Sequence, residues 1–265
     1  MATNEETTMT ARVLFLDIET APTVADVWSL RDLSVGINQI KVQPRTIGFG
    51  YRWSDSKRKA QFVSEYHNGH AEMVETARNL LDEADAMCGY NSQGFDAKHL
   101  NAEFVVAGLT PPSPYKHIDL YKVVRANFRL PSYKLQYVLQ RLDLGSKLSH
   151  TGHQMWTDCL QPDEGLSEEG IARKRKAWQL MSRYCRQDVD VLPALREALL
   201  PWMGGPFNAG NYAKVAGQHC PSCGSDNVQS RGVQVTTTLT YARFQCQSCG
   251  RWSRSKKSID SVDLR

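Results

Sequence analysis

The chain has 265 residues, of which 41% are hydrophobic and 23% are charged, and its formal net charge is +4. This length suits one full domain with a small appendix, and this composition excludes a wholly disordered chain. No apolar run approaches the roughly 20 residues of a membrane-spanning helix, and residues 1–12 lack the apolar segment of a signal peptide, so a cytoplasmic protein outside the membrane is expected.

Apolar runs and their spacing predict alternating strands and helices. Short apolar runs are typical of buried strands, and longer segments with helical apolar spacing are typical of amphipathic helices. The predicted strands are 13–16, 46–53, 60–64, 86–90 and 117–120. The predicted helices are 72–83, one through Leu100, Phe104, Val105 and Leu109, 134–142 and a long one over 168–200.

This order predicts an α/β domain over residues 12–202, with a mixed five-stranded sheet flanked by helices. Small residues over 203–218 are typical of a linker. The following segment, 219–254, is too short to build its own apolar core and needs a cross-link such as a disulfide or a bound metal. Residues 255–265 form a basic and polar tail.

Asp17 and Glu19 stand two residues apart at the end of the first predicted strand. Because side chains alternate along a strand, both carboxylates point to the same face. An Asp-x-Glu pair is also common at solvated strand ends, so this pair alone does not define a site.

Two further acidic segments are ambiguous when taken singly. Asp96 follows the fourth predicted strand and falls in the first turn of a helix, where the helix dipole favours an anion; the alternative is an ordinary acidic residue at a helix start. Tyr184 and Asp188 are four residues apart and share one face of the long helix. Apolar Met181 lies near them, so the pair faces inward, and a hydrogen-bonded core pair is the alternative.

In this order, the three acidic segments resemble the motifs of the DEDD exonuclease superfamily (DnaQ-like, with a ribonuclease H-like fold), and specifically its DEDDy branch. The phrases Leu16-Asp17-Ile18-Glu19-Thr20 and Tyr90-Asn91-Ser92-Gln93-Gly94-Phe95-Asp96 are similar to the exonuclease domains of family B DNA polymerases. The resemblance covers residues 12–202 without a polymerase domain, as in small phage and bacterial versions. The DEDDh branch would have His five residues before the last Asp, where this chain has Arg183.

The resemblance implies a 3′→5′ exonuclease that hydrolyses phosphodiester bonds with two divalent ions. Several close carboxylates need a countercharge, and Mg²⁺ or Mn²⁺ suits an all-oxygen site. The carboxylates that would hold the two ions are Asp17, Glu19, Asp96 and Asp188. Tyr184 would orient the nucleophilic water. Asn91 and Phe95 are expected to contact the terminal nucleotides, with packing as the alternative for Phe95.

Basic and aromatic residues are interleaved between the second and third acidic segments. Such a pattern can track a single strand by charge and stacking, and a solvated helix face with aromatic packing is the alternative. These residues are Tyr121, Lys122, Arg125, Phe128, Arg129, Tyr133, Lys134 and Lys147. Asp119, at the end of the last predicted strand, is expected to cap a helix rather than to serve as a fifth metal ligand.

The seven cysteines divide into two CxxC pairs and three isolated thiols, Cys88, Cys159 and Cys185. Each CxxC turn presents two thiolates to one tetrahedral ion, and the Gly after each pair lets the backbone turn. The segment between the pairs, 233–244, is typical of a hairpin. A small zinc ribbon at 219–254 is therefore predicted, with one structural Zn²⁺. Its ligands are Cys220, Cys223, Cys246 and Cys249.

The positive charge is concentrated in the last part of the chain. From Phe207 onward there are 8 Lys/Arg and 3 Asp/Glu residues, whereas the remainder has 24 and 25. This favours a polyanionic partner, with a solvated surface as the alternative. The basic and aromatic residues of the ribbon indicate nucleic-acid contact, and docking of a protein partner is the alternative. They are Arg231, Arg243, Arg251, Trp252, Arg254, Lys256 and Lys257.

The leading functional hypothesis is a 3′→5′ exonuclease that prefers single-stranded DNA. A 3′→5′ exoribonuclease is the first alternative, because the same kind of site acts on both polymers. A catalytically idle nucleic-acid-binding adaptor that works through its zinc ribbon is the second alternative. The complete set of four carboxylates with Tyr184 argues against the idle adaptor.

Overall fold

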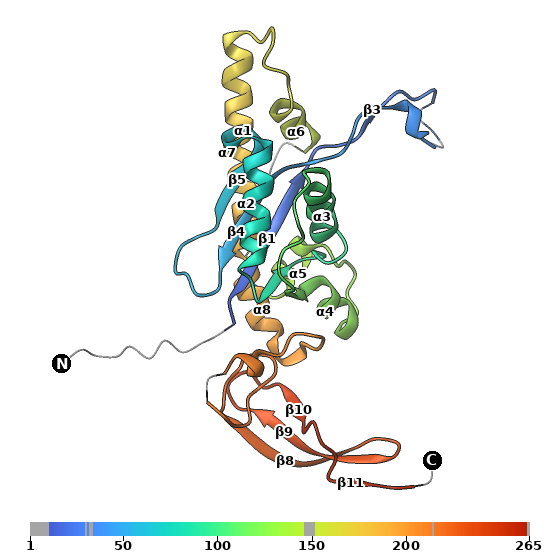
Figure 1. The fold of residues 1–265 in the computed structure, drawn as a ribbon, viewed down its shortest axis with the longest axis vertical. Helices are drawn as coiled ribbons and strands as arrows, with labels where there is room; N and C mark the ends of the chain where they lie inside the picture. Colours follow the sequence, from blue (N-terminus) through green and yellow to red (C-terminus); the bar gives the residue numbers. More distant parts are fainter. Residues whose placement is uncertain (1–10, 30, 32–33, 146–151, 214, 264–265) are drawn as a thin grey trace, which may run out of the picture.

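A mixed five-stranded sheet forms the centre of the larger domain (Figure 1). The computed structural model describes residues 11–29, 31, 34–145, 152–213 and 215–263. The strands lie in the order β5-β4-β1-β6-β7, with β1 antiparallel to β4 and parallel to β6. Their bounds are β1 Val13–Thr20, β4 Thr46–Trp53, β5 Gln61–Ser64, β6 Ala86–Gly89 and β7 Lys116–Asp119. The predicted ribonuclease H-like sheet is confirmed.

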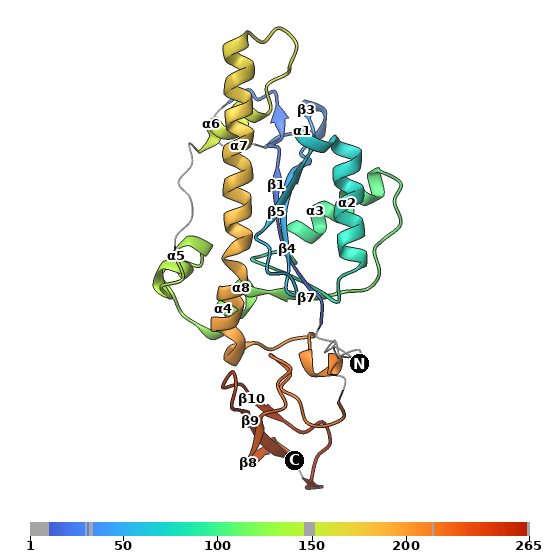
Figure 2. The same cartoon turned by 90° about the vertical axis from the view of Figure 1, so that its left-hand side faces the viewer.

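Helices cover both faces of this sheet (Figure 2). One face packs on α2 and α3 through a cluster that contains Leu14 and Leu16 of β1. The other face packs on α4, α5 and α8 through a cluster that contains Val13 and Phe15. Because side chains alternate along β1, Asp17 and Glu19 belong to the same face as Phe15. The helices are α1 Glu65–Asn68, α2 His70–Asp82, α3 Asp96–Val106, α4 Leu120–Asn127, α5 Leu135–Arg141, α6 His153–Cys159, α7 Glu168–Asp190 and α8 Leu192–Leu199.

The single long helix predicted over 168–200 is wrong, because the chain forms two helices there. α7 ends at Asp190, and α8 begins at Leu192 after one intervening residue, Val191. Pro193 lies in the first turn of α8, where its missing N–H costs no helical hydrogen bond. The break lets α8 pack beside α4 against the sheet, while α7 runs past the end of β1.

A two-stranded arm follows β1, after the carboxylate pair Asp17 and Glu19. It is formed by β2 (Val24–Ala25) and β3 (Ile40–Val42), with a short 3-10 turn, η1 (Ile37–Gln39), before β3. The polar and irregular sequence of this region gave no strand signal. None of the helices in the described parts of the chain is long and apolar enough to cross a membrane.

The C-terminal segment forms a separate four-stranded antiparallel sheet around β9. Its strands are β8 Val228–Val235, β9 Leu239–Cys246, β10 Trp252–Arg254 and β11 Asp260–Ser261. β8 and β9 form the predicted hairpin, which is longer than the segment 233–244 at both ends. The four cysteines gather at one end of this sheet, and the arrangement is that of a small zinc ribbon.

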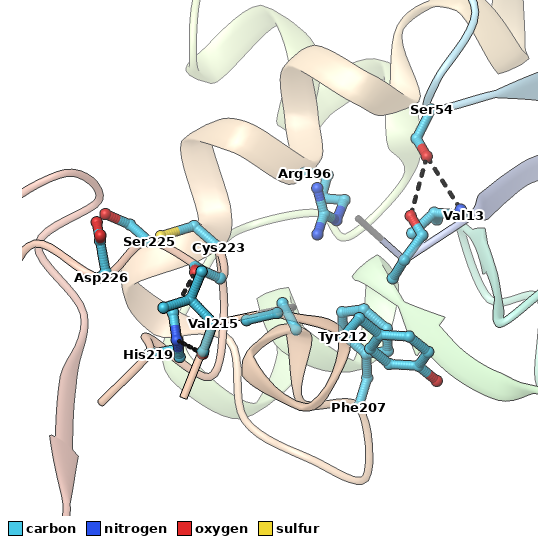
Figure 3. Close-up of a pocket in the computed structure, with 14 residues that line it drawn as sticks. Val13, Ser54, Arg196, Phe207, Tyr212, Val215, His219, Cys223, Ser225 and Asp226 are labelled. Atoms are coloured by element: carbon cyan, nitrogen blue, oxygen red, sulfur yellow. Dashed lines mark hydrogen bonds between the residues drawn. The ribbon is translucent and has the colours of Figure 1, made fainter. Parts of the chain in front are cut away.

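The segment between the two sheets is folded and holds the ribbon against the larger domain. Phe207 stacks on Tyr212, with ring centroids 5.9 Å apart, and both line a cavity of about 480 Å³ (Figure 3). The cavity is bounded by Arg196 of α8 on one side and by Cys223 of the ribbon on the other. The guanidinium of Arg251 also donates to the carbonyl oxygen of Pro201 at 3.3 Å. Direct contacts therefore fix the ribbon to the end of α8.

Candidate metal-dependent catalytic site

Asp17 and Glu19 lie in the second half of β1, on the face that packs against α7. Glu19 is 6% exposed, and Asp17 is half-buried. Asp17 pairs with Gly50 of β4, and this glycine allows α7 to approach the sheet closely. A Cβ at Gly50 would lie 3.1 Å from the Cys185 Sγ atom and 3.0 Å from a methyl of Val189. The bare backbone at this position thus brings the third acidic segment next to the first.

Asp96 begins α3 as predicted and is joined directly to β1. Its Oδ1 atom accepts a hydrogen bond of 3.0 Å from the backbone N–H of Ile18, the residue between the two β1 carboxylates. The side chain is 3% exposed. Burial raises the pKa of Asp96 to about 7, and the charge of Asp119 adds to the rise, while the Ile18 hydrogen bond opposes it. Ionisation of Asp96 is therefore costly unless a cation is near.

Tyr184 and Asp188 reach the same place from α7. Asp188 is 3% exposed. Burial raises the pKa of the Tyr184 phenol far above its usual value of 10.0, and the charges of Asp188, Glu19 and Asp17 raise it further. The three carboxyl groups therefore lie close to the phenol. Tyr184 stays protonated at any ordinary pH, so its hydroxyl can orient a ligand but cannot act as a base.

Cys185 is a member of this cluster that the sequence did not single out. Ligand atoms of Asp17, Glu19 and Cys185 all lie within 4.8 Å of one another, whereas Asp96 and Asp188 fall outside this tightest group of described residues. The Cys185 Sγ atom lies 3.5 Å from the carbonyl oxygen of Asp17. Burial, followed by the charges of the surrounding carboxylates, raises the pKa of the thiol well above 9.0. Cys185 is therefore a neutral packing group, as expected of an isolated thiol. Its position three residues before Asp188 was the available signal.

The loop between β6 and α3 places Asn91 and Phe95 on two sides of the carboxylates. Asn91 has a left-handed backbone with φ of 64°. Its N–H donates to Asp119 Oδ1 at 2.9 Å, and the N–H of Gln93 donates to the other oxygen of Asp119 at 3.2 Å. Asp119 also accepts from the backbone N–H of Tyr121 at the start of α4. Asp119 therefore caps a helix, as predicted, and also shapes the loop that carries Asn91.

Two open cavities flank the carboxylates. The first, of about 730 Å³, is lined by Asp17, Asn91 and Tyr184 together with Lys134 and Tyr133. The second, of about 480 Å³, is lined by residues of β1, the β6–α3 loop and α6. These are Ile18, Glu19, Thr20, Pro22, Phe95, Gly152, His153 and Trp156. The Phe95 side chain is 40% exposed, so it is available to a ligand and is not a core residue.

The interleaved basic residues divide between the two alternatives. Lys134 lines the cavity beside Asp17. Lys122 donates to Gln93 Oε1 at 2.7 Å, and the Arg125 guanidinium lies 4.5 Å from the ring centroid of Tyr133. Lys147 lies outside the described residues. Lys134 and several tyrosines therefore border the first cavity, whereas Lys122 and Arg125 make local contacts.

The four ribbon cysteines form a closed group that fits zinc. Their ligand atoms lie within 4.8 Å of one another, and the Sγ pairs Cys220–Cys249 and Cys223–Cys246 are each 3.6 Å apart. With Zn–S bonds of about 2.3 Å, a tetrahedral ion requires S···S separations of about 3.8 Å. Gly224 and Gly250 follow the two pairs with φ of 79° and 78°, a conformation that favours glycine. The cluster therefore matches a structural zinc site.

Comparisons with known proteins agree with this geometry. The family profile of the RNase_H superfamily matches residues 34–200, so the chain belongs to this superfamily. Among solved structures, the family B DNA polymerase from the hyperthermophilic archaeon Pyrobaculum calidifontis is similar, with a TM-score of 0.52 and 20% sequence identity. The match covers 72% of this chain and 25% of the polymerase chain, and at this identity it shows a shared fold. No curated protein matches.

Membership of the RNase_H superfamily and the acidic site together support a nuclease that acts on nucleic acid. Nucleases of this fold use divalent metals, and the four-cysteine cluster has the ligands for a second kind of metal, zinc.

Proposed function

We propose that the protein is a 3′→5′ exonuclease that uses two divalent ions and prefers single-stranded DNA. The observation that carries this proposal is the convergence of three distant segments at the end of β1. Asp96 of α3 accepts from the backbone between Asp17 and Glu19, and α7 brings Asp188 and Tyr184 close to the same two carboxylates. These are the carboxyl and phenol groups that the DEDDy resemblance names, and their proximity supports the proposal.

The donor set fits hard divalent cations. Glu19, Asp96 and Asp188 are only 3–6% exposed, and buried carboxylates that gather without a countercharge destabilise a protein. Burial raises the pKa of Asp96 to about 7, so its ionisation in this position already costs free energy. Oxygen ligands favour Mg²⁺ or Mn²⁺, which Asp17, Glu19, Asp96 and Asp188 would hold. When bound, such a pair of ions stabilises the negative charge that develops on the attacking and leaving oxygens of the phosphate.

The chain's own contribution to the reaction centres on Tyr184. Its phenol is neutral because burial and the adjacent carboxylates hold its pKa far above its usual value. Tyr184 and Asp17 line the same cavity, where a water molecule that attacks the scissile phosphate would stand. As a hydrogen-bonding group Tyr184 orients this water and leaves the removal of its proton to other groups.

The flanking cavities suit the 3′ end of a single strand. Phe95 and Trp156 line one of them, and aromatic faces stack on bases without regard to sequence. Lys134 and Tyr133 line the other, where a backbone phosphate would lie. Asn91, held by Asp119, faces the same cavity and would contact the terminal nucleotide. The terminal base of a duplex is paired with the other strand and must be unpaired before it can enter such a site.

End-labelled substrates test the proposal directly. Purified protein is incubated with DNA and RNA strands that carry a label at either the 3′ or the 5′ end, with Mg²⁺ or Mn²⁺ and without divalent ions. We expect a 3′ label to be released at once as a mononucleotide, a 5′ label to give a ladder of shortened strands, and Asp17→Ala and Asp188→Ala to be inactive. Release of the 5′ label first, or activity in Asp17→Ala, would reject the proposal. Faster digestion of RNA than of DNA would show that RNA is the preferred substrate.

A further inference from the structure

One face of the ribbon sheet carries a cluster of two aromatic and two arginine side chains. Side chains alternate along β9, so Tyr241, Arg243 and Gln245 lie on the same face of the sheet. On β10, Trp252 pairs with Gln245 and Arg254 pairs with Arg243, and residues directly opposite each other share a face. We define Tyr241, Arg243, Trp252 and Arg254 as the arginine–aromatic face.

The contacts within this face confirm that the four side chains lie together. The Arg254 guanidinium lies 4.1 Å from the ring centroid of Tyr241, and that of Arg243 lies 5.0 Å from the ring of Trp252. Arg243 Nε also donates to the carbonyl oxygen of Arg231 at 3.0 Å. A guanidinium that rests on a ring is held in place and keeps several N–H groups for an anion such as phosphate.

The charges of this face are exposed and are not balanced by carboxylates. Arg243 and Arg254 are both exposed, and the Trp252 side chain is 46% exposed. Within residues 215–263 the structure shows no ion pair to either arginine. The acidic residue on a ribbon strand, Asp260, pairs with Thr240 and therefore belongs to the opposite face. The two faces of the ribbon thus differ in charge.

Arg251 has a different role, although it is adjacent in sequence. Its guanidinium donates to Pro201 at the end of the larger domain, so it fixes the ribbon in place. The arginine–aromatic face is formed by other residues and is not part of this junction. The ribbon lies at one end of the molecule. β1 starts near the ribbon and runs away from it, and Asp17 and Glu19 are in the second half of this strand (Figure 1). The face is therefore remote from the candidate catalytic site.

We propose that the arginine–aromatic face is a second binding surface for single-stranded nucleic acid, separate from the catalytic site. The exposed Trp252 ring gives a base a surface on which to stack, and the arginines give phosphates bidentate partners. An acidic protein segment would satisfy the charges but would make no use of the flat rings. The face would hold the part of the strand that lies away from its 3′ end, so that long strands bind more tightly than short ones.

Binding without cleavage tests this surface independently of the exonuclease proposal. Full-length Asp17→Ala protein without divalent ions is titrated with a fluorescent oligothymidylate of about 30 nucleotides. Trp252→Ala should weaken binding by about 5–100-fold, the effect of losing one stacked base, and Trp252→Phe should restore most of it. Arg254→Gln should reduce the log–log salt slope by about 0.7.

The charge-matched control is Arg175→Gln. Arg175 is exposed on α7, whose N-terminal half lies at the opposite end of the molecule from the ribbon (Figure 1). It should bind the oligothymidylate as the parent protein does, and all variants should retain one zinc per chain. Parent-like affinity in both Trp252→Ala and Arg254→Gln, or an equal loss in Arg175→Gln, would overturn the surface. Normal binding by a wild-type protein that does not cleave would reject the exonuclease proposal alone.

Discussion

Replacing Asp96 with Asn should stabilise the protein at pH 8 when divalent ions are absent. The Asn Oδ1 atom can still accept the hydrogen bond from Ile18, which Asp96 accepts at 3.0 Å. What disappears is a buried negative charge. The pKa of Asp96 rises from 3.8 to about 7 on folding, mainly because of burial. At about 1.36 kcal/mol for each tenfold change in proton affinity, ionised Asp96 costs up to about 4 kcal/mol.

The sign of the pH dependence follows from this rise. A carboxyl whose pKa is raised in the native state binds more protons there than in the unfolded chain, so its contribution to stability is lost as the pH rises from about 4 to above 7. Since a buried amide also costs free energy, we expect a gain of about 1–3 kcal/mol for Asp96→Asn at pH 8. At pH 5 native Asp96 is protonated, and the gain should shrink by about 2–3 kcal/mol.

Thermal unfolding in buffer without Mg²⁺ or Mn²⁺, with the zinc retained, measures the effect. Each kcal/mol corresponds to about 2–4 °C in melting temperature for a domain of this size. The control is Asp263→Asn, which removes the same charge from an exposed position and should change the melting temperature little. Mg²⁺ should stabilise the wild-type protein and not Asp96→Asn. A lower melting temperature for Asp96→Asn at pH 8, or a gain that does not depend on pH, would refute the reasoning.

Three further substitutions separate chemistry from structure. Tyr184→Phe should lower the turnover rate by about 10–10³-fold with little change in substrate binding, measured by single-turnover kinetics, and wild-type turnover would remove Tyr184 from the reaction. Cys246→Ser should abolish the binding of one zinc per chain and unfold the ribbon, and full zinc content would exclude the four-thiolate site. Gly50→Val should lower stability by about 1–3 kcal/mol in denaturant titrations, because its side chain would push α7 away from β1; unchanged stability would show that α7 can shift freely.

The acidic residues were predictable because each occupies a position that local rules define. Asp17 and Glu19 follow an apolar strand, Asp96 begins a helix, and Tyr184 and Asp188 share a helical face. The ribbon was predictable for the same reason, since two CxxC turns with a following glycine specify a metal site without any long-range contact. The spacing of apolar residues predicted the strand or helix on which each acidic residue lies. The family resemblance predicted that these residues form one site.

The remaining features depend on packing between distant segments. Nothing in the sequence around Gly50 shows that α7 crosses it, so the contact of Cys185 with Asp17 was not predictable. The folded junction at Phe207 and Tyr212 also escaped detection, because small residues around them indicate a linker and the partner surface comes from the N-terminal strand. The break before α8 was predictable in principle from Pro193, yet the apolar spacing continued across it and concealed the boundary.

The most direct test of the metal centre is a titration of the protein with Mn²⁺, in which electron paramagnetic resonance measures the bound ion. Three segments that are far apart in sequence must supply ligands to one site, so Asp17→Asn, Asp96→Asn and Asp188→Asn should each lose Mn²⁺ affinity by at least about 10-fold, the size of effect seen when a metal site loses its support. Asp263→Asn should bind as the wild-type protein does. Asp96 and Asp188 lie outside the group formed by Asp17, Glu19 and Cys185, so normal Mn²⁺ binding by both Asp96→Asn and Asp188→Asn would contradict the shared metal centre.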